Sequence, residues 1–183
     1  MIKDPDEALV ERCRKGDGAA FAVLVKRYQG PIYNAAYRVL GNAEDASDIT
    51  QSVFLKIAER LDDYDPRYKF FSWIYRIALN ESLNLLRRNG REEPLGDDEE
   101  FLPGDARADP ERQALEAELS ARVQGALMKL KAQDRMMLAL RHFSECSYRE
   151  IADVLEIDEK TVKSRLFEAR SRMRGLLHEV HAA

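Results

Sequence analysis

The sequence has few of the residues from which covalent and metal sites are built. Its 183 residues include two cysteines and three histidines, and these do not fall into the spacing of a zinc site, a disulfide framework or a phosphate-binding loop. Cys13 and Cys146 are expected to be packed thiols in a reducing compartment. We therefore expect a protein that is not an enzyme, has no small-molecule substrate and uses no metal or cofactor.

Long apolar runs are missing as well. No run approaches the roughly 18 residues that a membrane span requires, and the N-terminal "MIKDPDEALVERCRKGD" lacks the apolar segment of a signal peptide. The composition is 45% hydrophobic and 34% charged, which suits a helical protein with packed cores. These features lead us to expect a cytoplasmic location.

Net positive charge is also absent. The formal net charge is -4 at pH 7, which argues against a general DNA-compacting protein. Residues 1–93 balance 15 basic against 15 acidic residues, residues 94–118 carry 2 basic and 9 acidic residues, and residues 119–183 carry 12 basic and 9 acidic residues. The acidity therefore lies in the middle, and both flanks remain able to face a polyanion.

The acidic middle also holds three of the six prolines. The stretch "NGREEPLGDDEEFLPGDARADPE" has few apolar residues and much like charge, which is typical of an extended, flexible linker. It predicts an acidic flexible linker over residues 93–110 between domains at residues 1–92 and 111–183. Both flanks have helical periodicity and no strand-like alternation, so the fold class is expected to be all-α, with two small helical domains.

Several helix boundaries can be predicted from single residues. Asp4-Pro5 is expected to open the first helix, with the proline at its first position. A later helix is expected to kink at Pro31 and to end at Gly41, and Asn42 is expected to cap the next one.

A helix-turn-helix is predicted near the C-terminus. "SYREIADVL" and "DEKTVKSRLFEARSRMRGLL" are joined by the short "EI". Ser147 and Glu150 have the spacing of a capping box, and Asp158 can cap the second helix. Between Lys160 and Arg174 that helix has six basic residues and one acid. A solvated basic face is the simpler alternative, but the capped helix and short turn before it favour DNA recognition.

A second polar face is predicted on a helix over residues 71–89. The preceding and overlapping "YDPRYKFFSWIY" contains six of the fifteen aromatic residues, and aromatics beside cations can stack on unpaired bases. We assign Phe71, Trp73 and Ile74 to the core instead. The residues that share the polar face are Arg76, Asn80, Asn84, Arg87, Arg88 and Arg91.

Three segments, taken in order, resemble the extracytoplasmic-function (ECF) sigma factors. "EDASDITQSVFLKI" resembles their region 2 segment that docks on the beta-prime clamp helices of RNA polymerase. "FFSWIYRIALNESLNLLRR" resembles the segment that recognises and melts the minus-10 element. "SYREIADVLEIDEKTVKSRLFEARSRMR" resembles region 4, which reads the minus-35 element and touches the beta flap.

The resemblance implies an alternative sigma factor that directs core RNA polymerase to specific promoters and helps to open them. Residues 1–92 would form sigma region 2 and residues 111–183 sigma region 4. The linker would thread polymerase channels near the RNA exit path. The implied partners are core RNA polymerase, promoter DNA and an anti-sigma factor, which in this family is often membrane-anchored.

Individual residues inherit roles from the resemblance and from the exposed helix faces. The polymerase contact would use Asp45, Asp48, Gln51 and Phe54. The remaining expected contacts are Tyr64, Arg67, Tyr68, Arg76, Asn80, Asn84, Arg87 and Arg88 for minus-10 DNA, and Lys160, Lys163, Ser164, Arg165, Phe167, Glu168 and Arg170 for minus-35 DNA.

The sequence departs from the family pattern at three acids. Glu145 and Glu156 stand where relatives often have glycine, and a left-handed conformation at Glu156 would cost roughly 1–2 kcal/mol. Glu168 stands where relatives commonly have a basic residue. It can accept a hydrogen bond from the N4 amine of cytosine, or it can pair with Arg165 or Arg172 and orient them; the sequence leaves both roles open.

Two other classes of protein remain as alternatives. A helix-turn-helix repressor or response-regulator output would need a sensor or dimerisation domain, and residues 1–92 have no ligand-pocket or phospho-acceptor signature. Such a protein would bind its operator without polymerase. An enzyme is disfavoured because the three histidines have no metal-ligand spacing.

Overall fold

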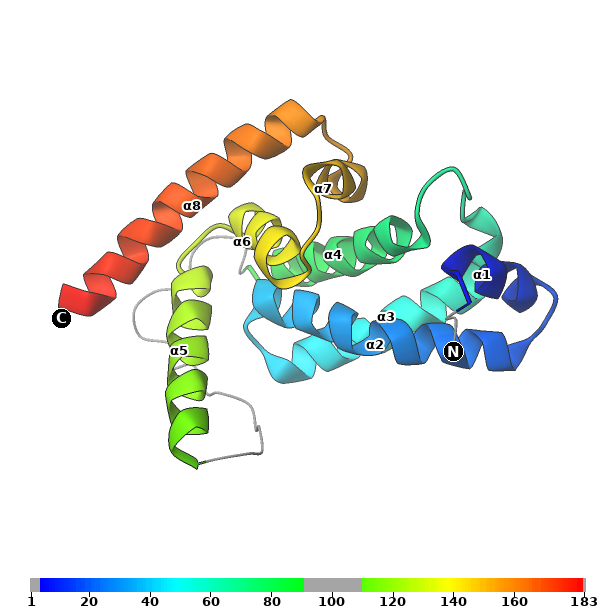
Figure 1. Cartoon of the computed structure of the whole chain (residues 1–183), viewed down its shortest axis with the longest axis horizontal. Coiled ribbons are helices and arrows are strands. Elements are labelled where there is room, and N and C mark those ends of the chain that lie inside the picture. Colours follow the sequence, from blue (N-terminus) through cyan, green and yellow to red (C-terminus); the bar gives the residue numbers. More distant parts are fainter. Residues whose placement is uncertain (1–3, 91–109, 183) are drawn as a thin grey trace.

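Residues 4–90 and 110–182 are described by the computed structural model, with side chains described over 4–90 and 118–178. Every regular element in these ranges is helical. The N-terminal half contains α1 (Asp6–Arg14), α2 (Gly18–Leu40), α3 (Ala43–Arg60) and α4 (Phe70–Arg88), with the short 3-10 helix η1 (Leu61–Asp63) between α3 and α4. Helices α2, α3 and α4 pack against one another, and α1 closes one end of this bundle (Figure 1).

Capping residues set most of these boundaries. The Asn42 side chain accepts a hydrogen bond from the backbone amide of Asp45 at 2.9 Å, as predicted. Gly41 ends α2 in the left-handed region with φ 73°, also as predicted. A Cβ at Gly41 would clash with the sulfur of Met128, so both the backbone angle and the space favour glycine here.

One boundary prediction needs correction. Pro5 occupies the N-cap of α1 with extended backbone, and no side chain caps the helix. The Asp4 carboxylate instead accepts a hydrogen bond from Arg12, which removes it from the capping position. Pro31 lies inside α2, which is assigned as one helix from Gly18 to Leu40. The helix continues for nine residues beyond Pro31, and the kink expected there stays a prediction.

The N-terminal core contains the inward faces of α2, α3 and α4 together with an aromatic cluster. Ile49, Val53 and Ile57 on α3 are buried, as their spacing predicts. Phe70 is 1% exposed and its ring makes edge contacts with Tyr28 and Tyr64. Burying such side chains supplies roughly 1.5–3 kcal/mol each, the main driving force for this half of the fold.

The C-terminal half begins with α5 (Pro110–Met128) and α6 (Ala132–Leu138), which continues into the π-helical segment η2 (Ala139–Phe143). The helix-turn-helix follows as α7 (Tyr148–Leu155) and α8 (Glu159–Ala182). The linker predicted over residues 93–110 and the basic residue Arg91 lie almost wholly outside the described residues.

The turn geometry of the helix-turn-helix follows the sequence closely. Ser147 and Glu150 form a reciprocal capping box at the start of α7, and Asp158 accepts a hydrogen bond from the amide of Thr161 at 2.7 Å. Glu156 has φ 55° and Glu145 has φ 54°. Both acids thus adopt the left-handed conformation for which glycine is better suited, and both carry its steric cost.

The two halves pack against each other, which the sequence pattern did not predict. Helix α7 lies against α4, and the C-terminal end of α2 contacts α5, α6 and η2 (Figure 1). At that end, Arg38 donates a hydrogen bond to the buried Gln124 at 3.0 Å. Its guanidinium also lies 4.2 Å from the centre of the Phe143 ring. The N-terminal and C-terminal halves therefore share one continuous apolar core.

Within the described ranges, no helix is long and apolar enough to cross a membrane.

Candidate nucleic-acid interface

The N-terminal part of α8 presents an open basic face. Lys160, Lys163 and Arg165 are exposed, while Val162, Leu166 and Ala169 are buried on the opposite side. Phe167 is 75% exposed, which is unusual for an aromatic side chain that only packs. The Ser164 hydroxyl donates to the carbonyl of Lys160 at 3.1 Å, so its oxygen keeps acceptor capacity. These side chains can reach phosphates and base edges.

Glu168 belongs to a short network further along α8. Its carboxylate accepts a hydrogen bond from Arg172 at 3.0 Å, and Arg172 also donates to Asp134 of α6 at 2.6 Å. Of the two pairings considered from the sequence, the structure has the one with Arg172. Glu168 therefore lies on the exposed face but is held by a cation that is anchored to α6.

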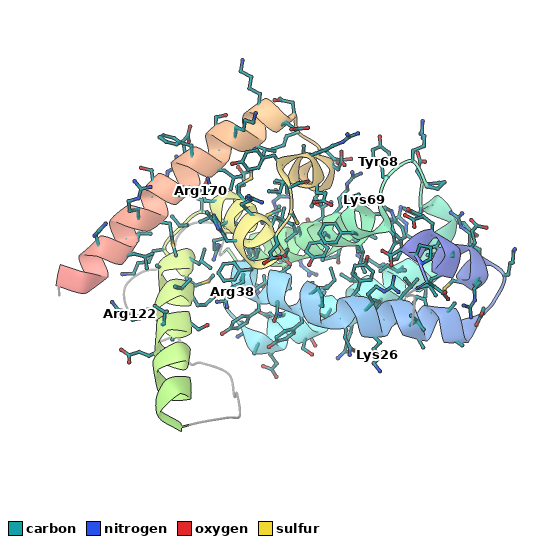
Figure 2. The ribbon with its side chains drawn as sticks, viewed as in Figure 1. Lys26, Arg38, Tyr68, Lys69, Arg122 and Arg170 are labelled. Carbon is teal, nitrogen blue, oxygen red and sulfur yellow. The ribbon has the colours of Figure 1, made fainter. Side chains whose placement is uncertain are left out.

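Arg170 departs from its predicted position. It is half-buried, and its Nε donates to Nε2 of His142 at 3.2 Å. Burial, followed by the charges of Arg170 and Arg141, lowers the pKa of His142. Arg170 thus faces η2 and not the outer surface (Figure 2). Helical spacing aligns Arg170 with Lys163, but at Arg170 this side of α8 already lies against η2.

Tyr64 also departs from its predicted position as a contact for minus-10 DNA. Its side chain is 3% exposed, and the ring contacts Phe70 and Trp73 at centroid distances of 5.5 Å. Its hydroxyl donates to the carbonyl of Tyr68 at 2.6 Å. Tyr64 therefore shapes the loop from beneath and offers no face to a base. Tyr68 itself is 48% exposed at the loop surface (Figure 2).

The polar face of α4 is only partly open. Asn80, Asn84, Arg87 and Arg88 are exposed, as the helical spacing predicts. Arg76 is half-buried because its guanidinium reaches into the C-terminal half. The exposed loop residue Arg67 donates to Asp65 at 2.8 Å, and this bond lowers the pKa of the Asp65 carboxyl.

Helix α3 presents the face expected to meet polymerase. Asp48 and Gln51 are exposed, Asp45 is half-buried, and Phe54 is half-buried with its ring against the core. Leu55 is 66% exposed on the same face, since it lies one helical turn beyond Gln51. The sequence analysis missed Leu55. It could have been found because it is an apolar residue that does not fall at the buried positions of α3.

An apolar cavity of about 570 Å³ lies between α5, η2 and α8. Most of its lining residues are apolar, and Arg170 and Arg174 lie among them. Phe143, which is 40% exposed, lines it, and Leu119, which is 60% exposed, lies one turn before Val123 on α5. This cavity could not be predicted from the sequence, because residues from separate segments line it. The lining residues are Val123, Leu127, Leu138, His142, Phe143, Arg170, Met173, Arg174, Leu177 and His178.

Family models match both halves of the chain. The model for Sigma-70 region 2 matches residues 24–92, and the model for Sigma-70, region 4 matches residues 120–173. The ECF RNA polymerase sigma-E factor of Escherichia coli (strain K12) is 36% identical over 173 residues, 90% of each chain. The chain belongs to the ECF sigma factor family.

Other members of the ECF sigma factor family match over similar lengths. The RNA polymerase sigma-H factor of Pseudomonas aeruginosa is 38% identical over 178 residues, 93% of this chain and 92% of the relative. The ECF RNA polymerase sigma factor SigW of Bacillus subtilis is 32% identical over 93% and 96% of the two chains. The family assignment therefore covers both halves and the segment between them.

Solved structures carry the same arrangement of helices. The structure of CnrH in complex with the cytosolic domain of CnrY is similar with a TM-score of 0.71 and 28% identity, over 96% of this chain and 99% of that one. The sigma factor RpoE of Bartonella quintana, in complex with the anti-sigma factor NepR, has a TM-score of 0.68. At 21% identity and 86% coverage of this chain, the latter likeness concerns the fold alone.

Proposed function

We propose that this protein is an alternative sigma subunit that directs core RNA polymerase to a specific set of promoters and helps to open them. The observation that carries the proposal is the presence of two separate polar helix faces, on α8 and on the loop and helix around α4, in a chain whose net charge is -4. A chain with so little positive charge neutralises few phosphates and needs a partner for tight promoter binding. Like the bacterial factors it resembles, it would act in the cytoplasm and catalyse no reaction itself.

The α8 face would read the minus-35 element in duplex DNA. Lys160, Lys163 and Arg165 would supply phosphate and base contacts from the start of a recognition helix, and Ser164 and Phe167 lie exposed among them. Glu168 would orient Arg172 in this scheme. Arg170 would hold α8 against η2 through its hydrogen bond to His142, without touching DNA.

The loop and the α4 face would bind the melted minus-10 strand. Tyr68 and Arg67 are exposed in the loop, and Asn80 and Asn84 follow at one-turn spacing along α4. Aromatic stacking contributes roughly 1–3 kcal/mol per base without strict sequence preference. Sequence readout would then come from the amide groups, since each amide can donate and accept. Arg87 and Arg88 would contact the backbone.

Two further surfaces would bind polymerase. On α3, Asp48 and Gln51 with the apolar Leu55 would meet the basic clamp helices, with Asp45 at the edge and Phe54 supporting the face from the core. The cavity between α5, η2 and α8 would take the helix of the beta flap, because an apolar lining that includes arginines suits an amphipathic helix that carries acids. An anti-sigma factor would compete for these same surfaces.

Transcript mapping tests the proposal. The purified chain and core polymerase are incubated with fragmented genomic DNA, and the 5′ ends of the transcripts are sequenced. We expect start sites that share two sequence elements upstream and that are absent with core alone. A chain that retards a DNA fragment tightly by itself, yet yields no new start sites with core, would instead be a repressor of the helix-turn-helix class.

A further inference from the structure

Arg76 of α4 is held at the C-terminal end of α7. Its Nη1 donates to the Glu156 carboxylate at 2.7 Å, and its Nη2 donates to the backbone carbonyl of Asp153 at 2.5 Å. The last carbonyls of a helix carry partial negative charge. Arg76 therefore donates to two oxygens at once, one from a carboxylate and one from a helix terminus, as an arginine can donate to two oxygens of a DNA phosphate.

Lys69 makes the matching contact at the other end of α7. Its Nζ lies 2.7 Å from the Glu150 carboxylate, and this bond is the largest cause of the lowered pKa of Glu150. Lys69 is the N-cap residue of α4 and Arg76 lies within that helix, and both side chains reach α7. Helix α7 thus lies against α4 with one acid at each end. Figure 2 shows Lys69 beside the exposed Tyr68, at the loop end of α4.

The backbone at Glu156 is costly for a residue with a side chain. Its φ of 55° is left-handed, and glycine would adopt this angle without strain. Glu145 has nearly the same angle, 54°, and is exposed. Of these two acids, Glu156 is the one that pairs with the N-terminal half. The carboxylate at position 156 thus gains a contact that a glycine would lose.

We propose that α7 closes the free protein by occupying Lys69 and Arg76 in place of nucleic acid, with Glu150 and Glu156 as the two contacts. This inference rests on the proposed minus-10 role of the loop and α4. Binding of the promoter or of polymerase would require α7 to separate from α4. The contacts at the α2 end, where Gly41 meets Met128, are largely apolar and would respond little to salt. The two ion pairs of α7 would weaken as salt rises, while its apolar contacts in the shared core would not.

The bias from the two ion pairs is small enough to be reversible. Glu156 is 67% exposed and Arg76 is 27% exposed in their side chains. An ion pair of this kind shifts an equilibrium by at most about fivefold. The apparent affinity of the α4 face falls by the fraction of molecules that are closed. The two pairs together would therefore weaken binding to α4 without abolishing it.

Glu156→Lys and Glu145→Lys test the proposal as a matched pair. Both change the same charge at an exposed, left-handed position, and Glu156→Lys alone sets a cation against Arg76. The full chain is titrated with a fluorescent single-stranded mixed-sequence oligonucleotide, and its radius of gyration is measured by small-angle X-ray scattering. Both measurements are made at about 50 mM and about 500 mM salt.

We expect Glu156→Lys to bind the oligonucleotide about fivefold more tightly than Glu145→Lys at low salt and to have the larger radius of gyration. The wild-type chain should expand at high salt. Equal affinities and equal radii for the two variants would overturn the proposal. If no variant binds the oligonucleotide but Glu156→Lys still expands, the closure by α7 stands and the minus-10 role of α4 is wrong.

Discussion

Reversing one charge on α3 should separate folding from polymerase binding. Asp48 is exposed beside Gln51 and away from the buried Ile49 and Val53. A substitution at such a position changes the free energy of unfolding by no more than about 0.5 kcal/mol. On a surface that meets basic clamp helices, Asp48→Arg places like charges together, which costs several kcal/mol. Each 1.4 kcal/mol is a factor of ten, so about 3 kcal/mol weakens binding more than 100-fold.

The assay measures both quantities on the same protein. Thermal unfolding gives the melting temperature, and titration of labelled protein with core polymerase gives the dissociation constant. Glu7→Arg makes the same charge change at an exposed position of α1 and should leave both values near those of the wild type. If Asp48→Arg folds normally and binds core as tightly as Glu7→Arg does, α3 is not the docking face.

Four further substitutions test separate parts of the molecule. Asn80→Ala should reduce promoter opening by an amount that depends on the minus-10 sequence. Lys163→Ala should weaken promoter capture, and if Lys163 contacts a phosphate, the salt dependence of binding should fall by about one unit of slope. Equal losses of activity for both variants, independent of promoter sequence, contradict this division. Glu145→Gly should raise the free energy of unfolding by up to about 1–2 kcal/mol by relieving the left-handed conformation, measured by chemical denaturation; a lower stability contradicts the steric account. Hydrogen bonds from Thr161 lower the pKa of Asp158 below its ordinary value of 3.8. The stability that the Asp158 carboxylate contributes is therefore present above pH 3.8 and is lost as the pH falls through the lower pKa of the folded state. Asp158→Asn, which can still cap α8, should make unfolding less sensitive to acid, and an unchanged dependence of stability on pH contradicts this.

Local features were predictable because they depend on a few neighbouring residues. The left-handed Gly41, the cap at Asn42 and the capping box at Ser147 follow from the backbone groups that each helix end leaves unpaired. The buried spacing of α3 and the exposed start of α8 follow from helical periodicity. The family resemblance was confirmed because its motifs extend over both halves.

Features that depend on long-range packing were not predictable. Tyr64 sits in a loop, and its burial depends on Phe70 and Trp73 closing over it. Arg170 and Arg76 have the spacing of exposed residues, yet each meets an element remote in sequence. The cavity beside α8 and the packing of α7 on α4 likewise join segments that periodicity treats separately.

Permanganate footprinting of a promoter identified by transcript mapping tests the central claim most directly, because the reagent modifies thymines that are unpaired. With core polymerase and this protein together, thymines in the minus-10 region should become reactive, and neither component alone should produce this reactivity. The account is contradicted if the protein binds the promoter without polymerase while the minus-10 thymines stay unreactive in the presence of both.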